Sequence, residues 1–406
     1  MVKKWFWRIA VCVLFLVLLF VVMHVDVRTG ASSYTDAHPS VETRKWAGDF
    51  TIVTEGKSLY RSLFHDIKNA RHSVWVHFFI VKEDGISNRF FQLLEEKARA
   101  GVDVRLSMDT LGSYVVKEKT LDQLKKSGVH VAKSRPLSLT HPFYSLHHRN
   151  HRRLITIDQE IAYIGGFNMG EEYLGKDPDL GYWRDYHIRI KSDGAKDMAR
   201  QFAKDWKEDT KEILSLQPEG TKKREESPEA TFQFLFTTGE SIVTKMVQWI
   251  DEAEQTIVMG TPYFLPDRNL INALKRAVDR GVEIKILVPG KPDHWYTKPP
   301  SYKMREELIK YGVAFYYYKK GFFHGKVMVI DHKWTDIGTA NWDPRSFYLN
   351  DESNCIIYDV EFAGEMESKL KQDMEDSKRV TKEEVTNIPF WKKLFKHTPE
   401  WIYYYF

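Results

Sequence analysis

The 406-residue sequence has few cysteines and little net charge. Cys12 and Cys355 are its two cysteines, and Cys12 lies inside an apolar run, so a disulfide framework is excluded and the redox compartment stays undetermined. With 60 lysines and arginines against 56 acidic residues, the formal net charge is only +4. This charge lacks the basic excess of a dedicated nucleic-acid binder, so we expect no nucleic-acid partner. It suits an anionic substrate surface.

One short motif occurs twice. Its pattern places a cation two residues, an aspartate seven residues, a glycine 14 residues and an asparagine 17 residues after a histidine. The first copy runs from His151 to Asn168, and the second, 173 positions later, runs from His324 to Asn341. Two copies with identical internal spacing are unlike the chance matches that short motifs usually give. The duplication therefore indicates a functional site built from two repeats.

Each copy predicts a strand that presents a histidine and a cation on one face, because side chains alternate along a strand. The Gly-x-x-Asn element that follows supplies a corner where backbone can approach a ligand, and a neutral amide. Together the copies provide His151 and His324, Arg153 and Lys326, and Asn168 and Asn341. This set suits a phosphoryl centre: cations and amides bind the non-bridging oxygens, one neutral histidine attacks phosphorus, and the other, protonated, donates to the leaving oxygen. Such chemistry needs neither a metal ion nor another cofactor.

Two other interpretations of the histidines are weaker. A single histidine beside a cation is usually an ordinary solvated residue, but duplication at fixed spacing argues against that interpretation here. A zinc site of His147, His148 and His151 is the second alternative. The neighbouring arginines would repel a cation, and no cysteine or carboxylate lies at ligand spacing. We therefore expect no metal site.

The residues around both motifs resemble those of the phospholipase D superfamily, and more narrowly those of bacterial cardiolipin synthases. The similarity runs from about residue 46 to about residue 359, and the segments that carry it are 150–153, 164–173, 183–187, 261–267 and 338–347. The resemblance implies a transferase with phosphatidylglycerol and cardiolipin as its membrane partners. A phosphatidyl group would pass from one phosphatidylglycerol to another through a phosphohistidine, with release of glycerol.

The resemblance also implies roles for individual residues. The amino-terminal motif usually supplies the nucleophile, so His151 would attack and His324 would act as acid and later as base, although the sequence alone does not order the two. In the family, an acidic residue on the next strand orients each histidine through its other ring nitrogen. Asp185 and Glu352 occupy those places.

Four other motif positions concern details of the site. Arg153 replaces the lysine that is more common in the superfamily, which keeps the charge and adds a planar fork of donors. Thr339 replaces the more common serine and keeps a hydroxyl. Asp158 and Asp331 complete the candidate catalytic residues, but at the ends of their strands they are better explained as structural anchors than as acid–base groups.

The N-terminus predicts one membrane-spanning helix at about residues 5–23. Residues 9–23 form an unbroken apolar run behind an aromatic flank and approach the length that spans a bilayer. A cleaved signal peptide is the alternative, but no small-x-small cleavage site follows the run. Basic residues crowd closer before the run than after it, which favours a single-pass protein of the cell membrane with its catalytic part outside.

Strand and helix patterns repeat in the same order along the chain. They predict an α/β fold in two matching halves. With the resemblance above, this implies two pseudo-symmetric phospholipase D-like α/β/α halves that form one catalytic unit. A polar, charged stretch between them is typical of a solvated linker. The predicted organisation is an anchor at 1–23, a tether at 24–45, a first half at 46–212, a linker at 213–231, a second half at 232–360 and a C-terminal helical segment at 361–406. Neither half alone would hold a complete site.

The C-terminal segment and the acceptor substrate leave alternatives. The segment is basic and aromatic, so it would lie in the membrane interface or cover the domain core. A phospholipase D-type hydrolase would use the same residues with water as acceptor. A nuclease is disfavoured by the mild charge and the membrane helix, and a non-enzymatic scaffold is disfavoured by two intact motifs. The oligomeric state stays unknown.

Overall fold

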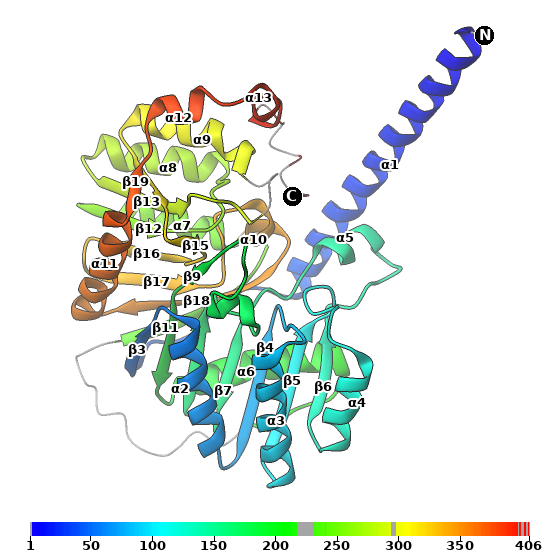
Figure 1. Cartoon of the computed structure of the whole chain (residues 1–406), viewed down its shortest axis with the longest axis vertical. Coiled ribbons are helices and arrows are strands. Elements are labelled where there is room, and N and C mark those ends of the chain that lie inside the picture. The colour runs from blue at the N-terminus through cyan, green and yellow to red at the C-terminus, as the bar shows by residue number, and fades with distance from the viewer. Residues whose placement is uncertain are drawn as a thin grey trace.

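A computed structural model describes residues 2–216, 231–239, 241–293 and 298–396, together with residues 398, 402 and 405. The linker predicted at 213–231 and the tip of the C-terminal segment fall largely outside these residues. Two sheets, each covered by helices on both faces, lie end to end, and one long helix projects from their junction (Figure 1). This arrangement confirms the predicted α/β fold with two similar halves.

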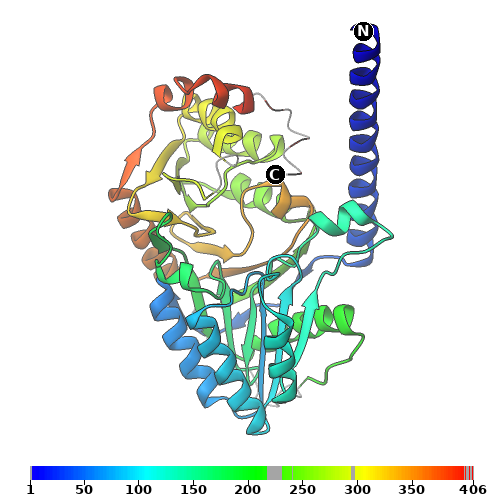
Figure 2. The ribbon, with the colours of Figure 1, turned by 45° about the vertical axis from the view of Figure 1, so that its right-hand side comes forward.

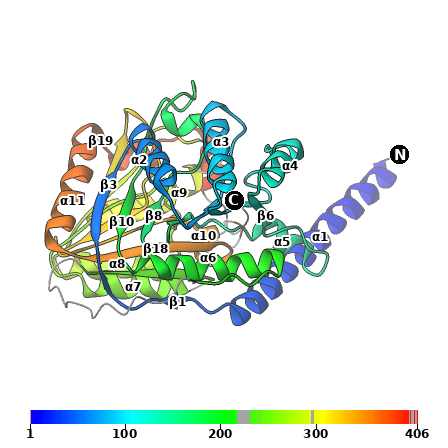
Figure 3. The same cartoon turned by 90° about the horizontal axis from the view of Figure 1, so that it is seen from below.

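The first half is a seven-stranded sheet with the order β3-β10-β8-β7-β4-β5-β6. Strands β4, β5 and β6 are parallel to one another, and the other pairs are antiparallel. Helices α2, α3 and α4 cover one face and α6 covers the other (Figure 3). The bounds are β3 Asp49–Val53, α2 Gly56–Asn69, β4 Ser73–Phe78, α3 Gly85–Arg99, β5 Asp103–Asp109, α4 Glu118–Lys126, β6 His130–Ser134, α5 Pro142–His147, β7 Leu154–Ile157, β8 Ile161–Gly165, η1 Glu171–Leu174, β9 Tyr182–Arg184, β10 His187–Lys191 and α6 Ala195–Thr210.

The second half repeats this order in a ten-stranded sheet. Its central path β11-β18-β17-β16-β12-β13-β14 matches the seven strands above one by one, with β1, β2 and β19 added at the edges. Helices α7, α8 and α9 cover one face and α11 covers the other. The bounds are β1 Val41–Glu42, β2 Trp46–Ala47, β11 Thr231–Thr238, α7 Ser241–Glu252, β12 Thr256–Gly260, α8 Arg268–Asp279, β13 Glu283–Pro289, α9 Lys298–Tyr311, β14 Ala314–Tyr318, β15 Gly321–Phe323, β16 Val327–Ile330, β17 Trp334–Gly338, α10 Pro344–Tyr348, β18 Asp351–Tyr358, α11 Val360–Glu375, β19 Ser377–Arg379, α12 Lys382–Thr386 and α13 Phe390–Lys396.

The halves share one apolar core at their junction. Phe202 of α6 and Leu370 of α11 belong to the same buried cluster, which also takes in strands of both sheets. Strand β15 of the second half pairs in parallel with β9 of the first half, with Phe322 opposite Trp183. Because the halves are joined by both apolar packing and strand pairing, the loops at their junction are held in fixed positions.

Helix α1 (Val2–Ala37) is longer than the predicted anchor. Its part from Lys4 to Ala37 is the one described helix that is long and apolar enough to cross a membrane. In Figure 2 it stands beside the body and only its base touches the two halves. The predicted tether at 24–45 is therefore helical as far as Ala37, because residues 24–37 pack on the protein and keep the helix wound.

The two motif aspartates close the same corner in each sheet. Asp158 and Asp331 follow β7 and β16 with a φ of 53° at both positions. The Asp158 carboxylate accepts the backbone N–H groups of residues 71–73, at 2.7–3.2 Å, and Asp331 accepts those of residues 254–256, at 2.7–2.9 Å. Each aspartate thus holds the chain that enters the neighbouring central strand. Both carboxylates are thus occupied by backbone donors, in agreement with the structural anchoring that the sequence favoured for them over an acid–base role.

We expect Asp331→Ala to lower the free energy of unfolding by roughly 3 kcal/mol, because three backbone donors lose a charged acceptor. Denaturant unfolding in detergent would measure the change. The matched control is Asp193→Ala, which removes a carboxylate that is 61% exposed in an ion pair with Lys196 and should leave stability unchanged. Equal midpoints for the two variants would contradict the anchoring role.

Candidate active site

Both motif histidines lie at the junction of the halves, and the opposite half holds the backbone of each one. The backbone N–H of His151, just before β7, donates to the carbonyl of Asp351 in the second half at 3.0 Å. The backbone N–H of His324, between β15 and β16, donates to the carbonyl of Arg184 in the first half at 2.7 Å. The two motifs are thus brought together by reciprocal contacts.

The side chains repeat this exchange. Nδ1 of His151 lies 2.8 and 2.9 Å from the two carboxylate oxygens of Glu352, and Nδ1 of His324 lies 2.6 Å from Asp185. Asp185 and Glu352, the two acids that the resemblance implies beside the histidines, thus each bind the histidine of the opposite half. A carboxylate at Nδ1 keeps the proton on that nitrogen and leaves the lone pair on Nε2.

Two buried cations lie beside the histidines. Nη1 of Arg153 donates to the His151 carbonyl at 2.5 Å, and Nζ of Lys326 donates to the His324 carbonyl at 2.6 Å. The Nε of Arg153 is buried without a hydrogen-bond partner. Burial lowers the pKa of Lys326 to about 7, although Asp185 and Glu352 oppose this shift. An anionic ligand would satisfy the spare donor and restore the full charge of the lysine.

The two asparagines differ in their surroundings. The Asn168 side chain is committed to the first half: Nδ2 donates to the Tyr173 hydroxyl, and Oδ1 accepts the Ile80 backbone N–H, both at 3.1 Å. The Oδ1 atom of Asn341 is buried without a partner, while its backbone N–H donates to Ser346 at 3.1 Å. The Asn341 side chain also hydrogen-bonds the carboxylate of Asp343, so its amide donor would reach a phosphate only by sharing or leaving that contact.

Burial keeps both histidines neutral in the substrate-free site. It lowers the pKa of His151 to about 4 despite the opposing effect of Glu352. It lowers the pKa of His324 to about 3, and Lys326 adds to this shift while Asp185 opposes it. A neutral imidazole is a nucleophile. An acidic imidazole needs the negative charge of a bound phosphodiester to hold its proton.

The walls of the site are aromatic. The ring centroid of Phe79 lies 4.8 Å from that of His151, and those of Trp183 and Phe322 lie 5.0 and 5.9 Å from that of His324. The histidines are only 6% and 8% exposed. These rings restrict the access of water to both imidazoles.

The zinc alternative does not fit the geometry. Within the ranges that the structure describes, no group of three or more His, Cys, Asp and Glu side chains is placed to hold a metal ion. His148 lies 3.2 Å from Asp351, whereas His151 faces Glu352 and the ring of His147 meets that of Tyr405 edge to face. The three histidines point to different partners.

Several residues that contact the site are not among the fixed positions of the repeated motif. Asp351, the neighbour of Glu352, is bound by Nε of Arg135 at 2.7 Å and by His148. Arg152 donates to both oxygens of Asp205 at 2.9 Å and to the Glu352 carbonyl at 3.1 Å. All of these contacts except that of Arg152 with Asp205 cross from one half to the other, so neither spacing nor composition would reveal them. The hydroxyl of Thr339, a motif position, donates to Glu352 at 2.5 Å.

The glycine corner of the first motif has a different use from the one predicted. A methyl group on Gly166 would overlap the carboxylate of Asp185, and one on Gly165 would overlap the backbone of Tyr186. The missing side chains therefore make room for the acid that binds His324. The chain around residues 185–187 passes so close to Gly165 and Gly166 that neither position has room for a side chain.

The chain is similar to known proteins in both sequence and fold. A family model described as "Cardiolipin synthase, PLD-like domain" matches residues 63–206 and 246–374. The chain is 35% identical to the minor cardiolipin synthase ClsB of Bacillus subtilis, over 97% of each sequence. It is 34% identical to the major cardiolipin synthase ClsA of the same organism, over 84% of this chain and 72% of that one. The crystal structure of a phosphatidylserine synthase from Haemophilus influenzae has the same fold, with a TM-score of 0.68 at 14% identity over 91% of this chain and 96% of that one.

We expect the two imidazoles to remain neutral as the pH falls from 7 to about 5, because a lowered pKa means that the folded protein resists protonation of these rings. Histidine NMR of the detergent-solubilised protein, assigned with His151→Gln and His324→Gln, would follow the titration. Midpoints near pH 4 and pH 3 are expected. Midpoints near the ordinary value of about 6.5 would contradict the buried, neutral state.

Proposed function

The chain belongs to the cardiolipin synthase family with phospholipase D-like domains, and on that premise we propose that it joins two phosphatidylglycerol molecules into cardiolipin and glycerol. The observation that supports this reaction best is the reciprocal pairing of His151 with Glu352 and of His324 with Asp185. It supplies two imidazoles of matched chemistry in one buried site. Transfer through a covalent intermediate needs both, one as nucleophile and one as proton carrier.

In the first step, Nε2 of His151 attacks the phosphorus of one phosphatidylglycerol. His324 takes up a second proton, on Nε2, from solvent when the anionic phosphodiester binds. The bond between phosphorus and the oxygen of the terminal glycerol then breaks, and the leaving oxygen takes this proton from Nε2 of His324. Glycerol departs and a phosphatidyl group remains on His151. The assignment of the nucleophile to His151 follows the family resemblance.

In the second step, a hydroxyl of another phosphatidylglycerol is the acceptor. His324, now neutral, takes the hydroxyl proton while the oxygen attacks phosphorus and the phosphorus–nitrogen bond of His151 breaks. The products are cardiolipin and the enzyme with His324 again protonated on Nε2, the state from which the bond breaking of the first step began. Atoms and protons therefore balance over one turnover, and no metal ion or cofactor takes part.

The cations hold the phosphate through both steps. Arg153 and Lys326 are placed to bind the non-bridging oxygens, where their charge offsets the negative charge that grows in the transition state. Asn341 offers a further amide. Asn168, which is bound to Tyr173 and Ile80, supports the strand beneath them. Glu352 and Asp185 steady the cationic form of whichever histidine carries the proton.

Hydrolysis by the same residues is the second candidate. It would replace the acceptor lipid with water and yield phosphatidic acid. The burial of both histidines and the aromatic rings beside them favour transfer, because they restrict water. Whether the enzyme transfers or hydrolyses therefore depends on which acceptor reaches the site, because the catalytic groups are the same in both reactions.

We place the enzyme in the cell membrane as a single-pass protein. Helix α1 would span the bilayer, and the basic residues before it favour the N-terminus inside and the catalytic halves outside. Two halves are kept in this proposal, but not their predicted bounds of 46–212 and 232–360. Strand β2 at Trp46–Ala47 pairs with β11 of the second half, and α11 and β19, which follow residue 360, belong to that half as well. The C-terminal segment at 361–406 begins with α11, which packs in the shared core, and ends in the basic helix α13.

We expect His151→Ala and His324→Ala each to abolish cardiolipin formation, because neither half-reaction has a substitute for the lost imidazole. The measurement incubates the purified full-length enzyme with phosphatidylglycerol in the presence of a chelator and identifies lipid products by mass spectrometry. Wild-type enzyme should give cardiolipin and glycerol. His65→Ala, which removes an exposed histidine of α2, is the control and should retain activity.

Two outcomes would count against transfer. Phosphatidic acid as the main product of the wild-type enzyme would establish hydrolysis. Unchanged cardiolipin formation by His151→Ala would remove the catalytic role altogether.

We expect Gly166→Ala to reduce the transfer rate by roughly 10- to 100-fold, because the new methyl group displaces the Asp185 carboxylate from His324. The control is Gly364→Ala in α11, where an added methyl group meets no atom within 4 Å. Rates and melting temperatures of both variants separate loss of positioning from loss of folding. A Gly166→Ala enzyme as active as the control would show that Asp185 does not need its observed position.

A further inference from the structure

We propose that residues 136–147, here called the leucine segment, form a second contact with the membrane beside α1. The inference rests on the proposed membrane span of α1. The segment consists of a loop followed by α5, and it carries three leucines that the protein leaves uncovered. Leu139 is 97% exposed, Leu137 is 57% exposed and Leu146 is 47% exposed. Leucine clusters of this kind suit the boundary between lipid headgroups and acyl chains.

The start of α5 is fixed at the end of the apolar run. The carboxylate of Asp26 accepts the backbone N–H groups of Phe143 at 2.8 Å and Tyr144 at 3.0 Å, and it lies 3.1 Å from Nδ1 of His141. Asp26 lies three residues beyond Met23, which corresponds to about 4.5 Å along the helix axis. The start of α5 is therefore held less than one helical turn from the end of the proposed span. Pro136 and Ser138 of the preceding loop line a cavity with Ser33 and Ala37 of α1, so the exposed Leu139 would reach the membrane from the tip of this loop.

The end of α5 is fixed at the same level by different residues. The His147 ring lies 5.3 Å from that of Tyr405, which in turn lies 5.8 Å from the ring of Phe20. The Tyr405 hydroxyl is 2.8 Å from Nδ1 of His24. Phe20 belongs to the apolar run itself. Both ends of α5 thus contact residues 20–26 of α1 or their neighbour Tyr405, where a bilayer would end. Tyr144 between them also lies 6.3 Å, ring to ring, from Tyr34, which is farther along the helix.

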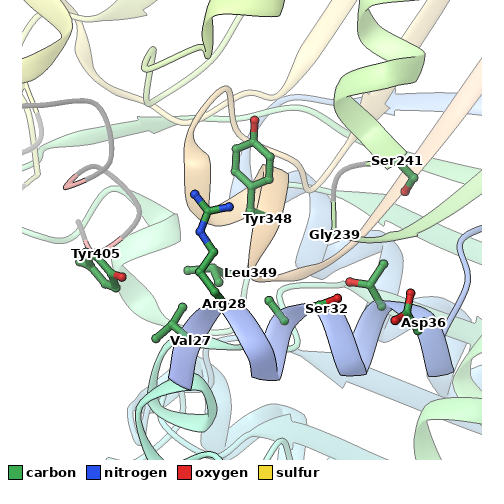
Figure 4. Close-up of a pocket in the computed structure, with 11 residues that line it drawn as sticks. Val27, Arg28, Ser32, Asp36, Gly239, Ser241, Tyr348, Leu349 and Tyr405 are labelled. Carbon is green, nitrogen blue, oxygen red and sulfur yellow. The ribbon is translucent and has the colours of Figure 1, made fainter. Parts of the chain in front are cut away.

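The base of α1 is also held against the second half, so this level is set for the whole enzyme. Val27 is 2% exposed and packs with Tyr144 of the first half and Leu349 of the second. On the second-half side, a cavity of about 430 Å³ separates the helix from Tyr348 and the turn at Gly239 (Figure 4). Arg28 points into this cavity from α1. Contacts with both halves prevent the leucine segment from moving away from the membrane independently.

The leucine segment leads directly to the catalytic groups. It ends four residues before His151, and the carbonyl of His147 accepts from Arg345 of α10 at 3.0 Å. Helix α10 follows Asn341 of the second motif. A phospholipid that leaves the bilayer along this segment would meet loops that carry both motifs.

The test measures the depth of the segment in full-length enzyme reconstituted in vesicles of phosphatidylcholine and phosphatidylglycerol. In a Cys12→Ser background, Leu139→Cys carries an environment-sensitive fluorophore, while the buried Cys355 stays unlabelled. We expect a blue-shifted emission and stronger quenching by lipids with a spin label near the headgroup than by lipids labelled deep in the acyl chain.

Two matched positions calibrate this result. Leu14→Cys lies within the apolar run and should be quenched by the deep label. Val360, which is 67% exposed, begins α11, a helix on the side of the body away from α1 (Figure 1). A fluorophore at Val360→Cys should be quenched by neither label. Quenching at residue 14 but not at residue 139 would overturn the second contact alone. Loss of quenching at both positions would overturn the membrane span and the contact together.

A functional variant gives an independent readout. We expect Leu137→Ser/Leu139→Ser/Leu146→Ser to lower the transfer rate from vesicles by roughly fivefold or more, because membrane binding scales with the apolar area that is buried. With soluble, short-chain phosphatidylglycerol the same variant should match wild type, which shows that the fold and the proposed chemistry are intact. An unchanged rate from vesicles would contradict the proposal, and an equal loss with both substrates would assign these leucines to folding instead.

Discussion

The carboxylate of each half binds the imidazole of the other half, and the remaining architecture serves to keep these two hydrogen bonds in one buried place. Backbone hydrogen bonds accompany these side-chain contacts. The backbone N–H of His151 donates to the carbonyl of Asp351, which precedes Glu352, and that of His324 donates to the carbonyl of Arg184, which precedes Asp185. Separation of the halves would therefore break the orientation of both histidines together. A duplicated fold makes such reciprocity possible because equivalent strands meet across a pseudo-twofold junction.

The charges at the junction couple substrate binding to protonation of one histidine. Arg153 and Lys326 balance Glu352 and Asp185, so the site carries little net charge while burial keeps both imidazoles neutral. A phosphodiester adds one negative charge, which favours a proton on one imidazole. In the proposed mechanism, the general acid would thus form when the phosphodiester on which it acts has bound. Around this centre, Arg135, Arg152 and His148 bind Asp351 or its neighbours and offset the cost of burying further acids.

The repeated fold and the candidate residues of the two motifs can be predicted from the sequence, because local patterns determine both. Strand alternation and the fixed spacing of His, cation and Asn are properties of neighbouring residues. The pairing of Asp185 with His324 and of Glu352 with His151 cannot be predicted from neighbouring residues, because it depends on how the halves dock. Asp158 and Asp331 show the same limit: their spacing resembles that of catalytic residues, but their partners are backbone amides of a segment more than 70 positions away. The helical course of residues 24–37 likewise follows from contacts such as Asp26 with α5, which polarity alone does not reveal.

The central claim is that imidazoles from the two halves act on a single phosphorus atom. A structure of the enzyme with bound vanadate, an analogue of the phosphoryl transition state, tests it most directly. We expect vanadium bonded to Nε2 of His151, one of its oxygens hydrogen-bonded to Nε2 of His324, and the others bound by Arg153 and Lys326. Vanadate bound by the residues of one half alone, with the second histidine turned away, would contradict the account.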